Sequence, residues 1–141
     1  MRWCLVFLFF GFQFSGISQH IRAEDRYGEK LFYVDDYTLY KADRYGDKLL
    51  FWDGRILREE NRYGQPVYYV DGNVVRRKDR YGEALYFFDG YTIRSRDRYG
   101  EKLYFLDGDV LRIKDRYGDP IYFFEGIPDR WTLLAVVHFL I

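Results

Sequence analysis

A repeat of 18 residues is the feature of this sequence that most constrains its fold. Each unit opens with Asp-Arg-Tyr-Gly, or with Asn in place of Asp, and continues with an aromatic run and a basic strand-like run. The units begin at Asp25, Asp43, Asn61, Asp79, Asp97 and Asp115. Regular self-similarity of this length indicates one supersecondary unit used many times. We therefore expect a single regular repeat domain.

Each unit carries two turn signals. The first is an acidic residue followed by Gly, as in Asp71-Gly72, with Asp35-Asp36 and Glu125-Gly126 as the deviant first and last members. We expect a type I′ hairpin turn there, with positive φ at both central residues. The second signal, Asp-Arg-Tyr-Gly, suits a longer loop in which Asp accepts backbone N–H groups and Gly adopts the left-handed conformation. Two turns leave two strands of about five residues in each unit.

The two strands of a unit differ in their apolar pattern. The first, such as residues 103–106, is apolar at every position, which predicts that it is covered on both faces. The second alternates, with an inward apolar residue followed by Arg, as in Leu57-Arg58, and is predicted to be half exposed. We expect hairpins arranged like petals, with first strands around an axis and second strands facing water, rather than a plain barrel.

The two ends of the repeat region complement each other. The sixth unit has only its first strand, residues 121–124, and residues 19–24 match a second strand, with Ile21 inward and Arg22 in the Arg position. We predict that these segments pair and close a ring of about six hairpins, which removes exposed sheet edges. The predicted fold class is all-β, a propeller-like closed ring of hairpins with a short C-terminal apolar helix or segment.

The termini define three regions. Residues 1–18, with basic Arg2 and an apolar run, are typical of a secretory signal peptide, so we expect a secreted or cell-envelope location, periplasmic or on the outer surface. Cleavage after Ser18 fits ring closure better than cleavage after Ala23. Residues 19–126 form the repeat domain. Residues 127–141 form an apolar tail, too short to span a membrane, which packs on the ring or docks a partner.

Composition excludes several function classes. The chain has 22 basic and 22 acidic side chains, so we expect no nucleic-acid partner. The one cysteine lies within residues 1–18, and beyond them the chain has one serine, Ser95, and two histidines, His20 and His138. We therefore expect no catalytic residues, no metal site and no cofactor. An enzyme would instead require a pocket that holds a carboxylate with a shifted pKa.

The candidate ligand-binding residues are the six Arg-Tyr pairs of the loops. They are Arg26, Tyr27, Arg44, Tyr45, Arg62, Tyr63, Arg80, Tyr81, Arg98, Tyr99, Arg116 and Tyr117. Gathered as a crown at one end of the ring, they could stack on sugar faces and bond hydroxyl groups. The alternative is that each Tyr packs over the neighbouring hairpin and each Arg stacks on it.

The repeat, its signal-like N-terminus and the alternation of Asp-Arg-Tyr-Gly and Asp-Gly turns resemble the β-flower proteins, small secreted bacterial proteins with four or five hairpins. The resemblance spans residues 19–126 and implies a location in the Gram-negative envelope but no activity. Six units, against four or five, is a departure that leaves the symmetry number open. Tyrosine-aspartate repeats and choline-binding repeats are similar more remotely.

From these observations we expect a secreted, non-enzymatic protein with a structural or interaction role. The alternative is a carbohydrate-binding protein that uses the Arg-Tyr crown. The partner would be a glycan or an envelope protein.

Overall fold

The computed structural model describes residues 18–140, in which twelve strands and one helix are formed. The first strands of the six repeat units are β2 (Lys30–Asp35), β4 (Lys48–Trp52), β6 (Pro66–Asp71), β8 (Ala84–Asp89), β10 (Lys102–Asp107) and β12 (Pro120–Phe124). The second strands are β1 (Gln19–Ala23), β3 (Thr38–Lys41), β5 (Ile56–Glu59), β7 (Val74–Arg77), β9 (Thr92–Ser95) and β11 (Val110–Ile113). The helix is α2 (Arg130–His138). The predicted signal peptide lies, apart from Ser18, outside the described residues.

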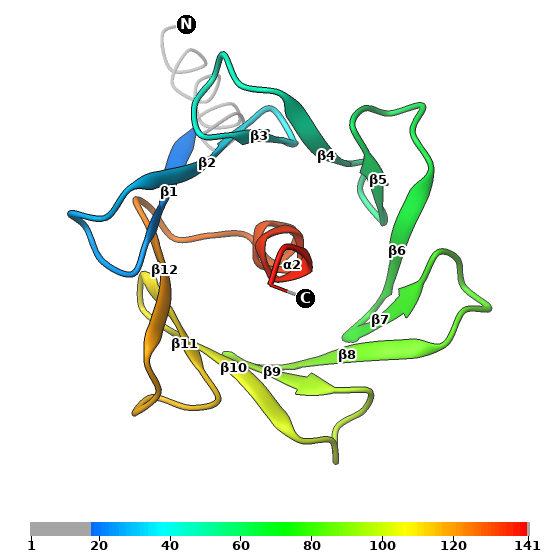
Figure 1. Cartoon of the computed structure of the whole chain (residues 1–141). Coiled ribbons are helices and arrows are strands. Elements are labelled where there is room, and N and C mark those ends of the chain that lie inside the picture. The colour runs from blue at the N-terminus through cyan, green and yellow to red at the C-terminus, as the bar shows by residue number, and fades with distance from the viewer. Residues whose placement is uncertain (1–17, 141) are drawn as a thin grey trace, which may run out of the picture.

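The strands form one closed antiparallel barrel, drawn along its axis in Figure 1. Every strand pairs with its neighbours in the chain, and β1 pairs with β12 to close the ring, with Ile21 opposite Phe124. The predicted closed ring of six hairpins is therefore confirmed. Because all neighbours are antiparallel, the six Asp-Arg-Tyr-Gly loops lie at one end of the barrel, here called the loop end, and the tight turns lie at the other, the turn end.

Both strands of each hairpin contribute side chains to the lumen, which corrects the expected arrangement of inner and outer strands. Residues directly opposite each other in an antiparallel pair share a face, so the register defines three inward layers of six residues. The layer at the turn end is Val34, Trp52, Val70, Phe88, Leu106 and Phe124. The middle layer, 0–3% exposed, is Ile21, Leu39, Leu57, Val75, Ile93 and Leu111. The layer at the loop end is Phe32, Leu50, Tyr68, Tyr86, Tyr104 and Tyr122.

A bulge explains why the first strands are apolar throughout. Where β9 pairs with β10, Ile93 lies opposite Tyr104 but Arg94 lies opposite Lys102, so Leu103 is an extra residue, and the same register shift recurs in the other five units. A bulge bends a strand and redirects its side chains. The remaining outward aromatic side chain, such as Phe105, faces Arg112 on the neighbouring strand. The residues of the apolar run therefore lie in three places: some point into the lumen, one is the bulge residue, and one lies on the outer face opposite an arginine.

The tight turns at Gly72, Gly90 and Gly108 differ from the expected type, whereas the first turn matches it. In the first hairpin, Asp36 and Tyr37 both have positive φ, 51° and 62°, as a type I′ turn requires. In the hairpin joining β6 and β7, Asp71 pairs with Val74, so the central residues are Gly72 and Asn73. Only the glycine has positive φ there, at 65°, as in a type II′ turn. Glycine is thus needed at the first central position, and the acid before it ends the strand.

The glycine of the Asp-Arg-Tyr-Gly loop has a steric role and not the left-handed conformation that we expected. A Cβ atom on Gly82 would lie 1.8 Å from the carbonyl oxygen of Arg77. The positive φ belongs to the residue before the Asp, for example Lys78 at 63°, whose N–H donates to the carbonyl of bulge residue Val67. The expected role of Asp is confirmed, because Asp79 Oδ1 accepts the N–H of Tyr81 at 2.9 Å.

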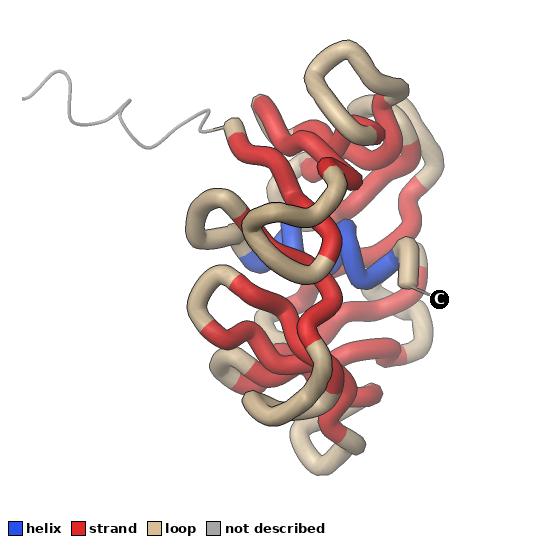
Figure 2. Tube along the Cα trace, turned by 60° about the vertical axis from the view of Figure 1, so that its left-hand side comes forward, coloured by secondary structure: helices blue, strands red, loops and turns tan. Residues whose placement is uncertain are grey.

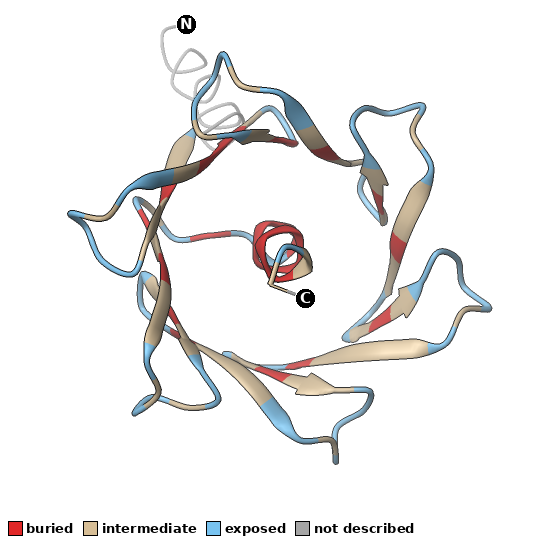
Figure 3. Ribbon diagram, in the orientation of Figure 1, coloured by how far each residue is buried: buried red, intermediate tan, exposed pale blue. Residues whose placement is uncertain are grey.

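The C-terminal tail forms a helix that fills the lumen, as the end-on helix at the centre of Figure 1 and the side view of Figure 2 show. Arg130 at its start donates to Gly72 and Asn73 at the turn end, and His138 at its end lies 2.9 Å from the Tyr68 hydroxyl. Its side chains from Trp131 to Val137 are buried on all sides, as Figure 3 shows in red. No helix of residues 18–140 is long and apolar enough to cross a membrane.

Candidate functional site

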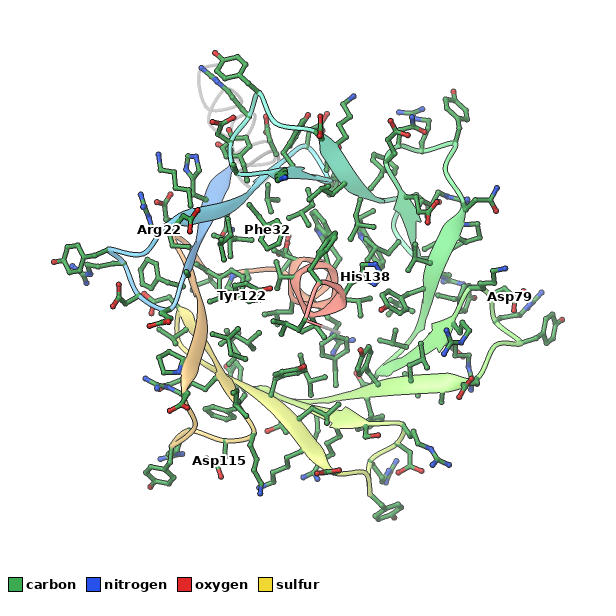
Figure 4. All side chains as sticks on the ribbon, viewed as in Figure 1. Arg22, Phe32, Asp79, Asp115, Tyr122 and His138 are labelled. Carbon is green, nitrogen blue, oxygen red and sulfur yellow. The ribbon has the colours of Figure 1, made fainter. Side chains whose placement is uncertain are left out.

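The six Arg-Tyr loops project outward from the loop end and are separated around the ring (Figure 1). Figure 4 shows Asp79 and Asp115 at the base of two such loops, far from the central helix. The loop tyrosines are 83–87% exposed in all six units. They therefore do not pack over the neighbouring hairpin, and this part of the alternative is wrong, whereas the predicted stacking of Arg on Tyr occurs in three units. The structure displays them as separate tips rather than bringing them together as one compact crown.

The arginines of these loops take part in stacking in half of the units. The guanidinium carbons of Arg44 and Arg80 lie 5.3 and 5.4 Å from the ring centroids of the tyrosines that follow them. Arg98 lies 6.0 Å from Tyr99. Such cation–π contacts hold a guanidinium beside an aromatic face that stays open to solvent. A tip of this kind offers an aromatic plate and several N–H donors to a ligand.

The fold explains the Asp and the Gly of the loop but not the Tyr. The Tyr contributes only its backbone N–H to the turn, for example Tyr99 to Asp97 Oδ1 at 2.9 Å, and any residue except proline could supply that group. A large aromatic side chain exposed to water contributes nothing to burial. The tip tyrosines are therefore the repeated residues that the architecture leaves unexplained.

A second set of arginines, on the outer face of the second strands, is structural. Arg94 Nε donates to Asp89 Oδ2 at 2.9 Å, and its Nη1 donates to the Gly100 carbonyl at 3.0 Å. Arg22, Arg58 and Arg112 repeat both contacts with their own turn acid and loop glycine. Arg76 donates to the Gly82 carbonyl in the same way, but its Nε lies 4.0 Å from Asp71 Oδ2 and makes no hydrogen bond. Sequence reasoning missed this role, although the constant spacing of five residues from turn acid to arginine in units 2 to 5 is a signal for it.

Two of the turn acids, Asp53 and Glu125, have a lowered pKa. Partial burial of Asp53 would raise its pKa, but the Arg58 guanidinium and the N–H groups of Ile56 and Arg55 donate to it and lower its pKa overall. Glu125 behaves in the same way, because the His20 N–H and Arg22 lower its pKa against the effect of burial. Both carboxylates are committed to holding the ring, so neither is poised as a general acid.

Three grooves lie between an outer strand face and a loop tip. The first groove, of about 500 Å³, has His20 and Tyr33 on its floor and Arg44 and Tyr45 on its rim. The second groove, of about 300 Å³, has Thr38, Tyr40 and Phe51 on its floor and Arg62 and Tyr63 on its rim. The third groove, of about 290 Å³, has Thr92 and Phe105 on its floor and Arg116 and Tyr117 on its rim. In each, the tip follows the outward aromatic residue by 12 positions.

The lumen holds a different group of tyrosines, which sequence reasoning did not single out. Tyr68, Tyr86, Tyr104 and Tyr122 line the loop-end layer, and burial raises the pKa of each. For Tyr122 the pKa rises to about 12, and its hydroxyl donates to the Val136 carbonyl near the end of the helix. Figure 4 shows Tyr122 and His138 on opposite sides of the central helix. The Tyr122 hydroxyl thus satisfies a carbonyl at the helix end, and the Tyr68 hydroxyl bonds the His138 side chain, which are structural tasks.

Within residues 18–140, no group of three or more His, Cys, Asp or Glu side chains is placed to hold a metal ion. Comparison with profiles of protein families, with curated proteins and with solved structures found no match. The candidate site therefore rests on the geometry of the loops and grooves alone.

Proposed function

We propose that this protein is a secreted, non-enzymatic interaction protein that binds its partner through the six Arg-Tyr tips. The observation that carries the proposal is the exposure of 83–87% at every tip tyrosine, in a loop whose geometry does not require tyrosine. Tyr and Arg are the residue types most enriched where binding energy is concentrated. Six tips on one ring would also bind a repetitive partner with avidity.

The envelope location proposed for the protein rests on the signal-like sequence of residues 1–18 and on the resemblance to β-flower proteins. The regular closed ring of hairpins supports that resemblance. A structural or interaction role also agrees with the repetition, since catalysis needs one asymmetric constellation and the ring offers equivalent tips. The lumen is filled by the helix, so the outer surface is the part available to a partner.

Carbohydrate binding is the second candidate, and the grooves favour it. Each groove combines an aromatic floor with hydroxyl, carboxylate and guanidinium groups, which is the chemistry that bonds sugar hydroxyls and packs on sugar faces. A glycan is therefore the first ligand class to examine.

The test compares residues 19–141 with a variant in which all six tip tyrosines are alanine. A matched control replaces Tyr37 and Tyr91, exposed tyrosines of the turn end, by alanine. Both proteins should retain the wild-type melting temperature, since exposed substitutions change stability by about 0.5 kcal/mol or less. We expect certain envelope proteins or polysaccharides, once identified, to bind both the wild type and the control. The same ligands should not bind the six-tip variant. Equal retention by all three folded proteins would contradict the proposal.

A further inference from the structure

At one outer position a tyrosine replaces the arginine of the other units, and the fold does not require this change. In five units the second strand carries an outward arginine that lies within 4.0 Å of the turn acid and donates to the loop glycine carbonyl, but in the strand after the first turn this position is Tyr40. Tyr40 is half-buried on the outer face, directly opposite Tyr33, and the two rings lie 6.0 Å apart. An aromatic surface thus replaces a structural contact at this place.

Tyr33 and Tyr40 connect two neighbouring grooves. Tyr33 lies on the floor of the first groove, and Tyr40 lies on the floor of the second. The tips Tyr45 and Tyr63 stand at the rims of these grooves. The outer faces of β1 to β4 therefore present two adjoining grooves with aromatic side chains at the floor, at the junction and at both rims.

The floors of these grooves are also more polar than the repeat requires. The residue opposite the outward aromatic side chain is His20 in the first groove and Thr38 in the second. At the equivalent position, β5, β7 and β11 carry Ile56, Val74 and Val110, and β9 carries Thr92 in the third groove. A β-branched apolar residue suffices for the strand, so His20 and Thr38 add polar groups to the two floors. The Thr38 hydroxyl donates to the Asp36 carbonyl at 3.3 Å, and His20 Nδ1 lies 3.4 Å from Glu125.

The charges around the two grooves balance. In the first groove one acid, Asp43, and one base, Arg44, line the wall, while Arg22 neutralises Glu125 at 3.1 Å. In the second groove Lys48 and Arg62 are matched by Asp36 and Glu60. Without a net charge the grooves have no electrostatic preference for a polyanion or a polycation. Aromatic faces with balanced donors and acceptors suit a hydroxyl-rich, uncharged ligand.

We propose that the first and second grooves form one continuous site for an uncharged oligosaccharide or polysaccharide, with Tyr33 and Tyr40 at the junction. This inference rests on the proposed binding by loop tips and narrows it to two of the six tips and to one ligand class. Sugar units in the two grooves are held together by the polymer, so a longer chain binds more tightly than a short one.

The decisive variant is Tyr40→Arg, which restores the residue of the other units. By analogy with Arg58, the new arginine would bond Asp35 and the Gly46 carbonyl, so stability should not fall. It also removes the aromatic junction. With dextran, laminarin, xylan and chitohexaose as uncharged probes, the wild type should bind at least one. Tyr40→Arg and Tyr45→Ala/Tyr63→Ala should each weaken that binding by about tenfold or more, the loss expected for an aromatic contact.

The matched comparison is Tyr81→Ala/Tyr99→Ala, which removes two equally exposed neighbouring tips that lie outside these two grooves. Its loss of affinity for the same probe should be several-fold smaller than that of Tyr45→Ala/Tyr63→Ala, and Tyr91→Ala at the turn end should leave the affinity within about twofold. An equal loss in Tyr81→Ala/Tyr99→Ala would overturn the two-groove site while leaving tip binding in place. Binding of alginate alone, with steep salt dependence, would overturn the uncharged ligand class. If no polysaccharide binds the wild type, the inference fails, and the six-tip comparison with envelope proteins still tests the proposed function separately.

Discussion

Replacing Leu134 by alanine tests whether the tail helix is the core of the barrel. Leu134 is 1% exposed and lies on a helix enclosed by three inward layers of the ring. A Leu→Ala change in a core costs about 2–5 kcal/mol, and the upper half of this range applies where the surroundings cannot collapse into the cavity. A closed ring of paired strands cannot contract locally, so we expect about 3–5 kcal/mol. For a domain of this size that corresponds to a fall in Tm of roughly 10–20 °C.

Thermal unfolding followed by circular dichroism measures this loss. The near-ultraviolet signal reports directly on the lumen, because Trp52 of the ring stacks on Trp131 of the helix with centroids 6.4 Å apart and planes 3° apart. Ile127→Ala is the matched control, since Ile127 belongs to the same tail but is 85% exposed, and it should change the free energy of unfolding by less than about 0.5 kcal/mol. Equal, small shifts in the two variants would refute the helix as the core of the ring.

Three further predictions concern closure, loop sterics and pH. Deleting residues 19–24 removes β1 and its pairing with β12, so Tm should fall sharply; an unchanged value would contradict closure by β1. Gly82→Ala should lower the free energy of unfolding in urea by about 1–3 kcal/mol, because the new Cβ would clash with the Arg77 carbonyl. Gly126→Ala is the control and should have no such effect, because its Cβ would have no contact closer than 3.8 Å. Equal urea midpoints for the two variants would refute the steric role of Gly82. Burial lowers the pKa of His138 and the nearby Glu59 opposes this only in part, so the unfolded chain binds the proton more readily. Stability should therefore fall as pH drops through and below about 6.5, and His138→Gln should flatten that slope; an identical slope would contradict it.

The repeat allowed the ring to be predicted because its period constrains the topology strongly. Once residues 19–24 were aligned with the second strands, the pairing of β1 with β12 followed, and Ile21 and Arg22 occupy the inward and outward positions that the alignment predicts. The layer assignment within a unit was harder. A bulge adds one residue to each first strand, so an apolar run that suggests two covered faces in fact belongs to a barrel strand.

The turn conformations could not be read from residue types alone. Gly82 was expected to be left-handed because glycine usually occupies such positions, yet Lys78 takes that conformation and Gly82 is needed for close contact with a carbonyl. A left-handed conformation and a close backbone contact both favour glycine, so the residue type alone does not tell which of the two applies at Gly82. The conformation of the tail was similarly open, because its apolar residues fit a helix or an extended segment, and the structure shows a helix packed against the inward layers of the ring.

The candidate site was predicted in its residue types but not in its arrangement. The tip tyrosines such as Tyr45 were identified from the repeat, but the sequence could not show that they stand apart around the ring. The grooves depend on how each loop folds back toward a strand face 12 residues earlier, which is a tertiary property. The departure at Tyr40 is visible in the sequence, yet its meaning requires the structural role of the arginines that it replaces.

The measurement that tests the binding role most directly is nuclear magnetic resonance of residues 19–141 with ring-labelled tyrosine, titrated with a panel of host and bacterial polysaccharides. The six tip tyrosines and the four lumen tyrosines are distinct populations, since the tips are 83–87% exposed and the lumen rings face the helix. We expect a binding polysaccharide to shift or broaden tip resonances, assigned by single Tyr→Ala variants, and to leave the lumen resonances of Tyr68, Tyr86, Tyr104 and Tyr122 unchanged. A polysaccharide that binds without affecting any tip resonance would contradict the account.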